Sequence, residues 1–252
     1  MHLTDFITIG IINFCENEWS IAEEDSAGAN PMDFIDNANQ IREAKAVHDK
    51  VIVHGGHEYY NLPSPRMQKQ YRFYIDNGAD IVVGHHTHCI SGMETYKGKQ
   101  IYYSLGNFLF TKTSIYDDWY KGIVLKIEVS KNKGIKVIPV FVEQSKSDFN
   151  LSLLTGKEKE ELAHRFTNYN ELIQTESALY SAWQKFINQR EKTYSNYWSP
   201  LAFVGNKYLK ALIAKTGVLK PQSKASSLYL NLLRCEAHRD VSQSILTKQI
   251  VK

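Results

Sequence analysis

The first third of the sequence alternates between short apolar runs and amphipathic segments. Residues 7–14, 51–53 and 80–84 are rich in β-branched side chains and typical of buried strands, whereas the segments that open at Asn30-Pro31 and Ser64-Pro65 repeat apolar residues at helical spacing. Neighbouring parallel strands need a long crossover connection, usually a helix. The order strand, helix, strand, helix, strand therefore predicts a parallel sheet covered by helices.

The middle of the sequence predicts antiparallel pairs instead. Residues 92–105 form two alternating runs joined at Lys97-Gly98, which is typical of a hairpin. Two further runs, 122–130 and 134–142, indicate a second antiparallel pair. We therefore expect an α/β fold whose sheet is mixed, with parallel strands from the first part of the chain and antiparallel, α+β-like pairs from the middle.

The strand pattern gives way to helical spacing from about Gly156 onward. We expect residues 157–252 to form a helical appendage. We accordingly divide the chain into a domain at residues 1–150 and a helical C-terminal region at residues 151–252.

The net charge and the cysteine content limit the kinds of binding partner and the cellular compartment that we expect. Thirty Lys and Arg against 27 Asp and Glu give a net charge of +3, which is too small to indicate a nucleic-acid partner or an anionic membrane. No apolar stretch approaches the roughly 20 residues of a membrane span, and the start of the sequence lacks the features of a secretory signal. Because Cys15, Cys89 and Cys235 are far apart and odd in number, we expect reduced thiols and a cytoplasmic location.

Histidines gather where two of the predicted strands end. Five of the nine lie between positions 54 and 88, in the segments "VIVHGGHEYY" and "VVGHHTH". In open α/β sheets, ligands bind beyond the carboxyl ends of the strands. Residues two apart can point the same way, so His86 and His88 can present two imidazoles to one point. His54, from the neighbouring strand, can add a third.

Three imidazoles at one point predict a metal site. Imidazole binds manganese, zinc or iron through a neutral nitrogen, so we expect one or two such divalent ions at His54, His86 and His88. Glu58 can orient a ligand or exchange protons with a substrate. His57 and His85 can equally be ligands or hydrogen-bonded loop residues.

Three segments resemble a known family. "VIVHGGHEYYNLPSP", "GADIVVGHHTHCISGMETYKGKQIYYSLGNFLF" and "WYKGIV" are similar to CapA-type poly-γ-glutamate capsule-synthesis proteins, a branch of the calcineurin-like metallophosphatase superfamily. The resemblance covers residues 7 to about 142. It implies a metallophosphatase-type αββα sandwich, with His54, His86 and His88 as ligands of a two-metal centre. Glu58 and Asn107 fall on motif positions that line the same pocket.

The sequence also departs from this family. Members normally carry a Gly-Asp strand end, an Asn-Leu-Glu segment and an Asn-His pair upstream of the strand that here is 7–14, and these motifs are missing. We therefore expect an N-terminally incomplete domain. Two adjacent divalent ions repel each other unless anionic ligands neutralise them. Glu16 and Glu18 follow a strand end and can either face the pocket or be loop carboxylates.

Two functions follow from these observations. The first is a metal-dependent hydrolase of the phosphoesterase type in capsule or poly-γ-glutamate synthesis, acting on an anionic substrate that is a phosphoester or polyglutamate-like. The alternative is a catalytically inert homologue that serves as an assembly or interaction module, as a homo-oligomer or beside a complementing chain. A serine hydrolase is disfavoured because no GxSxG elbow surrounds Ser64 or Ser104.

Overall fold

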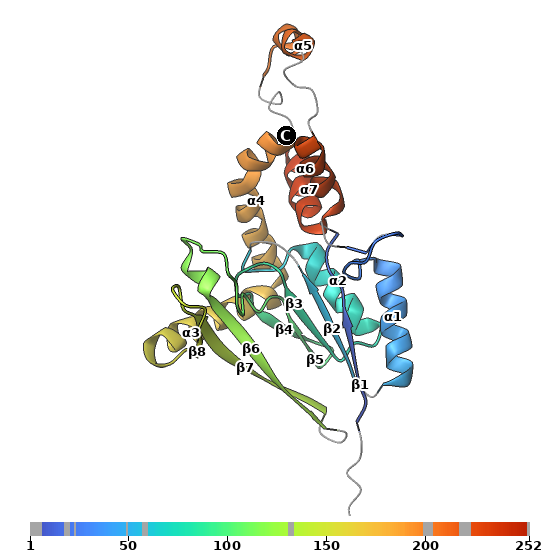
Figure 1. Ribbon diagram of the computed structural model, residues 1–252, viewed down its shortest axis with the longest axis vertical. Helices are drawn as coiled ribbons and strands as arrows, with labels where there is room; N and C mark the ends of the chain where they lie inside the picture. The colour runs from blue at the N-terminus through green and yellow to red at the C-terminus, as the bar shows by residue number, and fades with distance from the viewer. Residues whose placement is uncertain are drawn as a thin grey trace, which may run out of the picture. The chain divides into compact units, whose positions relative to one another are not determined.

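The computed structural model (Figure 1) forms two compact units, which we describe separately. It describes residues 7–17, 21–22, 24–48, 50–56, 60–130, 134–198, 204–216 and 223–250. The first unit contains the residues up to Glu16 and Ile21–Tyr180, and the second contains Asn17 and the residues from Ser181 onward. The predicted division of the chain into a domain at residues 1–150 and a helical region at residues 151–252 stays a prediction.

A five-stranded mixed sheet forms the centre of the first unit. Its strands lie in the order β1-β2-β3-β5-β4. The neighbours β1–β2, β2–β3 and β3–β5 are parallel, and β4 pairs with β5 in the antiparallel direction. The bounds are β1 (Ile9–Asn13), β2 (Lys50–Gly56), β3 (Ile81–His85), β4 (Met93–Tyr96) and β5 (Lys99–Tyr102). The predicted parallel strands, the hairpin and the mixed sheet are confirmed.

Two crossover helices, α1 (Phe34–Val47) and α2 (Pro65–Asp76), connect the parallel strands. The predicted N-cap of α2 is confirmed, because the Ser64 hydroxyl accepts a hydrogen bond from the Met67 amide at 3.1 Å. The predicted start of α1 at Asn30-Pro31 is wrong. Asp33 caps that helix, accepting from the backbone amides of Ile35 at 2.8 Å and Asp36 at 3.0 Å, so the helix begins three residues beyond the proline.

A second sheet packs against the first. It contains β6 (Lys121–Ser130), β7 (Gly134–Gln144) and β8 (Leu151–Leu153) in antiparallel order. One buried cluster joins both sheets and helix α3 (Gly156–Gln174), with members such as Val83, Tyr102, Ile123, Phe141 and Phe166. The first unit therefore includes α3, whose Phe166 ring packs against Phe141 at 5.9 Å between centroids.

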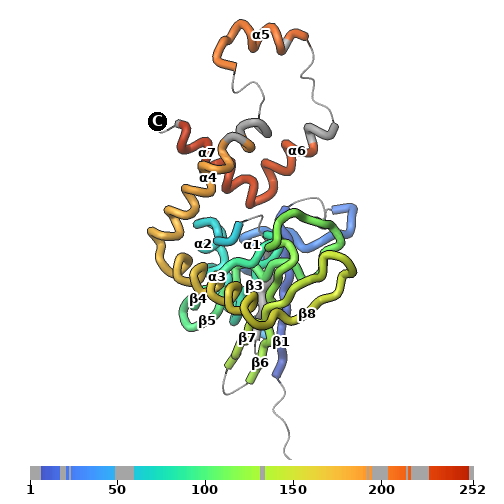
Figure 2. Tube along the Cα trace, turned by 90° about the vertical axis from the view of Figure 1, so that its left-hand side faces the viewer, coloured from blue at the N-terminus to red at the C-terminus, as the bar shows by residue number. Residues whose placement is uncertain are grey.

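The remaining helices are α4 (Glu176–Trp198), α5 (Lys207–Lys215), α6 (Ser223–Arg234) and α7 (Glu236–Ile250). Within the second unit, α6 and α7 are joined at Cys235 and contact each other, and Figure 2 shows that they spread apart from this junction. The Tyr194 hydroxyl lies 2.7 Å from Nδ1 of His238, which ties α4 to α7. None of the described helices combines the length and apolar content that a membrane span requires.

A buried carboxylate connects α2 to the hairpin of β4 and β5. Glu94 is only 3% exposed and accepts two hydrogen bonds from Arg72, at 3.0 Å from Nε and 2.6 Å from Nη2. The Tyr103 hydroxyl donates a third, and the Gln68 amide lies 3.4 Å away. Each oxygen of this carboxylate is therefore paired, which is the condition for burying a charge at acceptable cost.

Two buried tyrosines stack beside this carboxylate. The rings of Tyr71 and Tyr103 lie 5.5 Å apart and almost parallel, at 3°. Burial raises the pKa of both phenols well above the ordinary value, assisted at Tyr71 by Tyr74 and Glu16, and at Tyr103 by Glu94. The Tyr71 hydroxyl has no hydrogen-bond partner among the described residues.

These tyrosines predict a loss of stability in alkali. Because the pKa is higher in the folded than in the unfolded chain, the stabilisation is complete below the unfolded pKa of about 10 and is lost as pH rises above it. We expect the free energy of unfolding in urea to fall as the pH rises above about 10. Tyr71→Phe should reduce this fall without lowering stability at neutral pH, whereas Tyr103→Phe should lower neutral stability by about 1 kcal/mol, because it removes a donor from Glu94. A pH dependence unchanged by Tyr71→Phe would contradict the assignment.

Candidate functional site

The site lies at the carboxyl edge of the parallel sheet. In the register of β1 and β2, Asn13 is opposite His54, and in that of β2 and β3, Gly56 is opposite His85. The ends of these strands therefore adjoin one another at the edge where α/β sheets bind ligands. Strand β3 ends at His85, and the "HHTH" turn follows it directly. The backbone of these histidines therefore lies at the predicted edge of the sheet.

The turn after β3 holds two histidines in an unusual backbone conformation. His86 has φ 85° and His88 has φ 55°, a region that residues other than glycine rarely adopt. Such residues cost on the order of 1–3 kcal/mol each and persist only where the surroundings enforce them. The buried Thr87 enforces this turn, because its hydroxyl lies 2.7 Å from both the Cys89 carbonyl and the Ser104 hydroxyl.

Glycine is also required just before this turn. A Cβ on Gly84 would lie 2.1 Å from the carbonyl oxygen of Tyr103, much closer than any side chain allows. The glycine therefore lets the end of β3 approach the backbone that follows β5. This close approach carries the histidine turn next to the segment that contains Ser104 and Asn107.

The structure brings two of the three predicted ligands together. The imidazole centroids of His86 and His88 lie 5.9 Å apart, with a tilt of 37° between the rings. A metal–nitrogen bond of about 2.1 Å places two rings that share an ion on the order of 5–6 Å apart. The spacing of His86 and His88 therefore fits ligands of one ion or of two neighbouring ions.

One hydrogen-bonded chain fixes the tautomer of His88. Nδ1 of His88 lies 2.8 Å from Oδ1 of Asn107, and Nδ2 of Asn107 donates to the backbone carbonyl of Trp119 at 2.8 Å. A carbonyl only accepts, so the amide nitrogen of Asn107 must face Trp119 and its oxygen must face His88. In the neutral ring, His88 then carries its proton on Nδ1 and its lone pair on Nε2, which is a tautomer that metal-binding histidines use.

Two aromatic rings hold the His88 imidazole in place. Trp119 stacks on it at 4.7 Å between centroids, and Phe110 meets it edge-on at 4.9 Å. Phe110 and Trp119 also contact each other at right angles, at 5.0 Å. Neither ring was predicted to contact a histidine. The signal for Trp119 was its place in "WYKGIV", one of the segments that carry the family resemblance.

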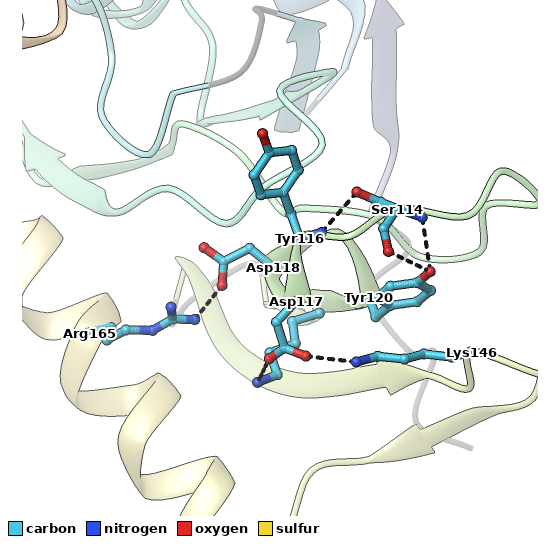
Figure 3. Close-up of polar contacts among 8 residues, drawn as sticks. Ser114, Tyr116, Asp117, Asp118, Tyr120, Lys146 and Arg165 are labelled. Carbon is cyan, nitrogen blue, oxygen red and sulfur yellow. Dashed lines mark hydrogen bonds and ion pairs between the residues drawn. The ribbon is translucent and has the colours of Figure 1, made fainter. Parts of the chain in front are cut away.

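Polar contacts fix the short 3-10 helix η1 (Asp117–Tyr120) that carries Trp119. In Figure 3, Asp118 points toward Arg165 of α3, at 2.8 Å, and Asp117 points toward Lys146, at 3.1 Å. Hydrogen bonds from Lys121, at 2.5 Å, and from Lys146 lower the pKa of Asp117. The Trp119 indole also donates to the Lys112 carbonyl at 2.8 Å. The ring that stacks on His88 is therefore held on a rigid support.

Several predicted residues lie outside this description. His57, Glu58 and Glu18 are outside the described residues, and so is the side chain of His54. The described part of the chain contains no group of three or more His, Cys, Asp or Glu side chains placed to hold a metal. The roles of His54 and Glu58 therefore stay predictions.

Glu16, a candidate for the pocket, and the thiol of Cys89 are both buried. Glu16 is only 1% exposed, so its carboxylate is not a solvated loop residue, and it lies close enough to Tyr71 to raise the pKa of that phenol. Burial raises the pKa of the Cys89 thiol to about 12. Because a thiolate is the reactive form, Cys89 is a packing residue and not a nucleophile at neutral pH.

Comparisons with known proteins converge on one family. Residues 7–112 match the family model described as bacterial capsule synthesis protein PGA_cap. Over 108 residues, or 41% of this chain, the sequence is 40% identical to the PGA biosynthesis protein CapA of Bacillus subtilis (strain 168), of which the match covers 28%. Over 64 residues, or 25% of the chain, it is 50% identical to the capsule biosynthesis protein CapA of Bacillus anthracis, of which the match covers 16%.

These matches contain most of the site. His86, His88, Asn107 and Phe110 all fall inside residues 7–112, and Trp119 follows shortly after. The matched segment spans less than a third of each of the two curated relatives. The resemblance found in the sequence motifs is thus confirmed for the part of the chain that carries the histidines.

Proposed function

We propose, from the match of residues 7–112 to the family model of bacterial capsule synthesis protein PGA_cap, that the chain belongs to this family and acts in capsule synthesis as a metal-dependent hydrolase of the phosphoesterase type. The observation that carries the proposal is the fixed tautomer of His88, whose Nδ1 is engaged by Asn107. A histidine held in this way by a neighbouring acceptor is typical of a metal ligand.

The described side chains fit a divalent metal in part. His86 and His88 would hold it, with His54 as the third ligand, and manganese, zinc or iron suits such a donor set. One or two ions bound there would activate a water molecule and stabilise the charge that develops on a phosphoryl group. The substrate would accordingly be an anion, either a phosphoester or a polyglutamate-like chain.

The remaining residues would position the ligands and limit access by water. Asn107 would be a positioning residue, because it keeps the proton of His88 on Nδ1. Trp119 stacks on one face of the His88 ring and Phe110 meets it edge-on, and both contacts would restrict its rotation. Glu58 would exchange protons with the substrate or orient a ligand.

Metal analysis together with a model substrate tests this proposal. Purified protein, dialysed against manganese, should retain the ion stoichiometrically, and it should hydrolyse bis(4-nitrophenyl) phosphate faster than metal-free protein. A well-folded protein that neither retains manganese nor gains phosphodiesterase activity would overturn the enzyme assignment. The interaction-module alternative would then account for the chain.

A further inference from the structure

A basic stretch of sequence without acidic residues surrounds helix α5. Residues 192–235 contain seven lysines and arginines and no aspartate or glutamate. The rest of the sequence contains 23 basic and 27 acidic residues, so the net charge of the whole chain does not reveal this stretch. Clusters of this size attract anionic surfaces, and their effect depends on where the charges lie and not on the total. The stretch lies outside residues 7–112, which match the family model.

Helix α5 separates apolar side chains from cationic ones. At 3.6 residues per turn, Tyr208, Leu209 and Leu212 fall within an arc of about 100° around the helix axis. Lys210 and Lys215 lie on opposite flanks of this arc. Lysine side chains in such positions can cover apolar surface with their stems while their ammonium groups stay in water. This arrangement is typical of helices that lie in the plane of a membrane interface.

The apolar arc of α5 is exposed. Tyr208 is 73% exposed, Leu212 is 61% exposed and Leu209 is 47% exposed. Single exposed apolar side chains are common on protein surfaces, but three neighbours on one short helix form a patch. A helix of nine residues is also marginal in water unless its apolar face packs against something. A surface that covers this arc would therefore stabilise the helix.

Local hydrogen bonds define both ends of α5. The side chain of Asn206 accepts from the backbone amides of Tyr208 at 2.9 Å and Leu209 at 3.2 Å, and so caps the first turn. The Thr216 hydroxyl donates to the Ile213 carbonyl at 2.6 Å, beyond the last helical residue. Because the groups that begin and end the helix belong to its own segment, α5 can keep its conformation on a new surface.

We propose that α5 binds the surface of a membrane that contains anionic lipids. The arc of Tyr208, Leu209 and Leu212 would enter the boundary between headgroups and acyl chains, and the lysines would pair with lipid phosphates. A tyrosine suits this depth because its ring is apolar and its hydroxyl is polar. A nucleic acid or another purely polar polyanion would leave the arc uncovered, so the apolar side chains favour a lipid bilayer.

Sedimentation with lipid vesicles tests the proposal on the whole chain. The probe is a vesicle of phosphatidylcholine and phosphatidylglycerol in equal parts. We expect the protein to bind it at least about tenfold more tightly than a vesicle of phosphatidylcholine alone, which has no net charge. Added salt should weaken the binding, because the lysines act at an exposed surface.

Substitutions of exposed apolar residues assign the binding to α5. Leu212→Ser should weaken binding to the anionic vesicles by about tenfold, because it removes a leucine from the arc. Leu153→Ser, the same change at a position of similar exposure on β8, should bind like wild type. Tyr208→Trp should add fluorescence that shifts to shorter wavelength when the vesicles bind, because the indole would leave water.

Charge reversal provides a second matched pair. Lys207→Glu with Lys210→Glu should weaken binding to the anionic vesicles and remove most of its dependence on salt. Lys157→Glu with Lys159→Glu, an equal charge change on exposed positions of α3, should bind the vesicles like wild type. None of these residues belongs to the proposed metal site, so manganese binding should be the same in both variants.

Four outcomes would overturn the proposal. The first is that the folded wild-type protein fails to bind the anionic vesicles. The second is that vesicles of phosphatidylcholine alone bind as tightly, which would remove the role of the lysines. The third is that Leu212→Ser leaves binding unchanged, which would make the stretch a site for polyanions in general. The fourth is that sedimentation without lipid shows a wild-type dimer that Leu212→Ser dissociates, which would make a second copy of this chain the occupant.

Discussion

Replacing His88 by alanine should abolish stoichiometric manganese binding while the protein stays folded. The imidazole has its proton fixed on Nδ1 by Asn107, so its Nε2 is the donor that the substitution removes. Isothermal titration of metal-free protein with manganese measures the loss, and circular dichroism monitors the fold.

Two further variants separate ligation from general damage. Asn107→Ala should weaken manganese binding by about 10–100-fold and not abolish it, because it removes only the group that orients His88. His164→Ala, the same chemical change at an exposed position of α3, should bind manganese like wild type. Equal binding by wild type and His88→Ala would rule out His88 as a ligand.

Replacing Arg72 by alanine should destabilise the first unit by about 3 kcal/mol, because it leaves the Glu94 carboxylate buried without its counter-ion. The hydrogen bond that Arg72 donates to Glu94 raises the pKa of Arg72, so the guanidinium stays charged in the folded protein. Arg72 is partly exposed, and for this reason we take the lower end of the usual range for breaking a buried pair. Urea unfolding followed by tryptophan fluorescence measures the change.

The second partner provides the internal control. In the Arg72→Ala background, Glu94→Gln should recover part of the stability, because a neutral amide needs no counter-ion. Lys97→Ala removes an exposed ion pair with Asp76 and should leave the unfolding midpoint unchanged. If Arg72→Ala and Lys97→Ala shift the midpoint equally, the buried pair has no special role in stability.

Local pattern was sufficient to predict the parallel strands, the Lys97-Gly98 hairpin and the Ser64 cap. Each depends on residues close in sequence, as the positive φ of both Lys97 and Gly98 illustrates. The predicted start of α1 was wrong because the side chain of Asp33, two residues after Pro31, caps the helix. The place of α3 in the first core could not be predicted, because an apolar stripe packs equally well on a sheet or on another helix.

The histidine site was also predicted only in part, because some of its contacts join residues that are far apart in the sequence. The strand end was enough to predict that His86 and His88 lie close together, although a turn with positive φ at both residues joins them, and not an alternating strand. Trp119 and Phe110 contact His88 because the chain after β5 returns to the histidine turn that follows β3. No periodicity in the sequence predicts such a return. Asn107 was assigned to the same pocket through the family motif, and its contact with His88 gives that assignment a physical role.

Anomalous diffraction from crystals grown with manganese tests the central claim most directly. The account predicts an anomalous peak about 2.0–2.3 Å from Nε2 of His88, with nitrogen atoms of His86 and His54 in the same coordination shell or that of an adjacent ion. A fully occupied manganese elsewhere on the protein would contradict it. So would a His54 ring that points away from the histidine turn at residues 85–88.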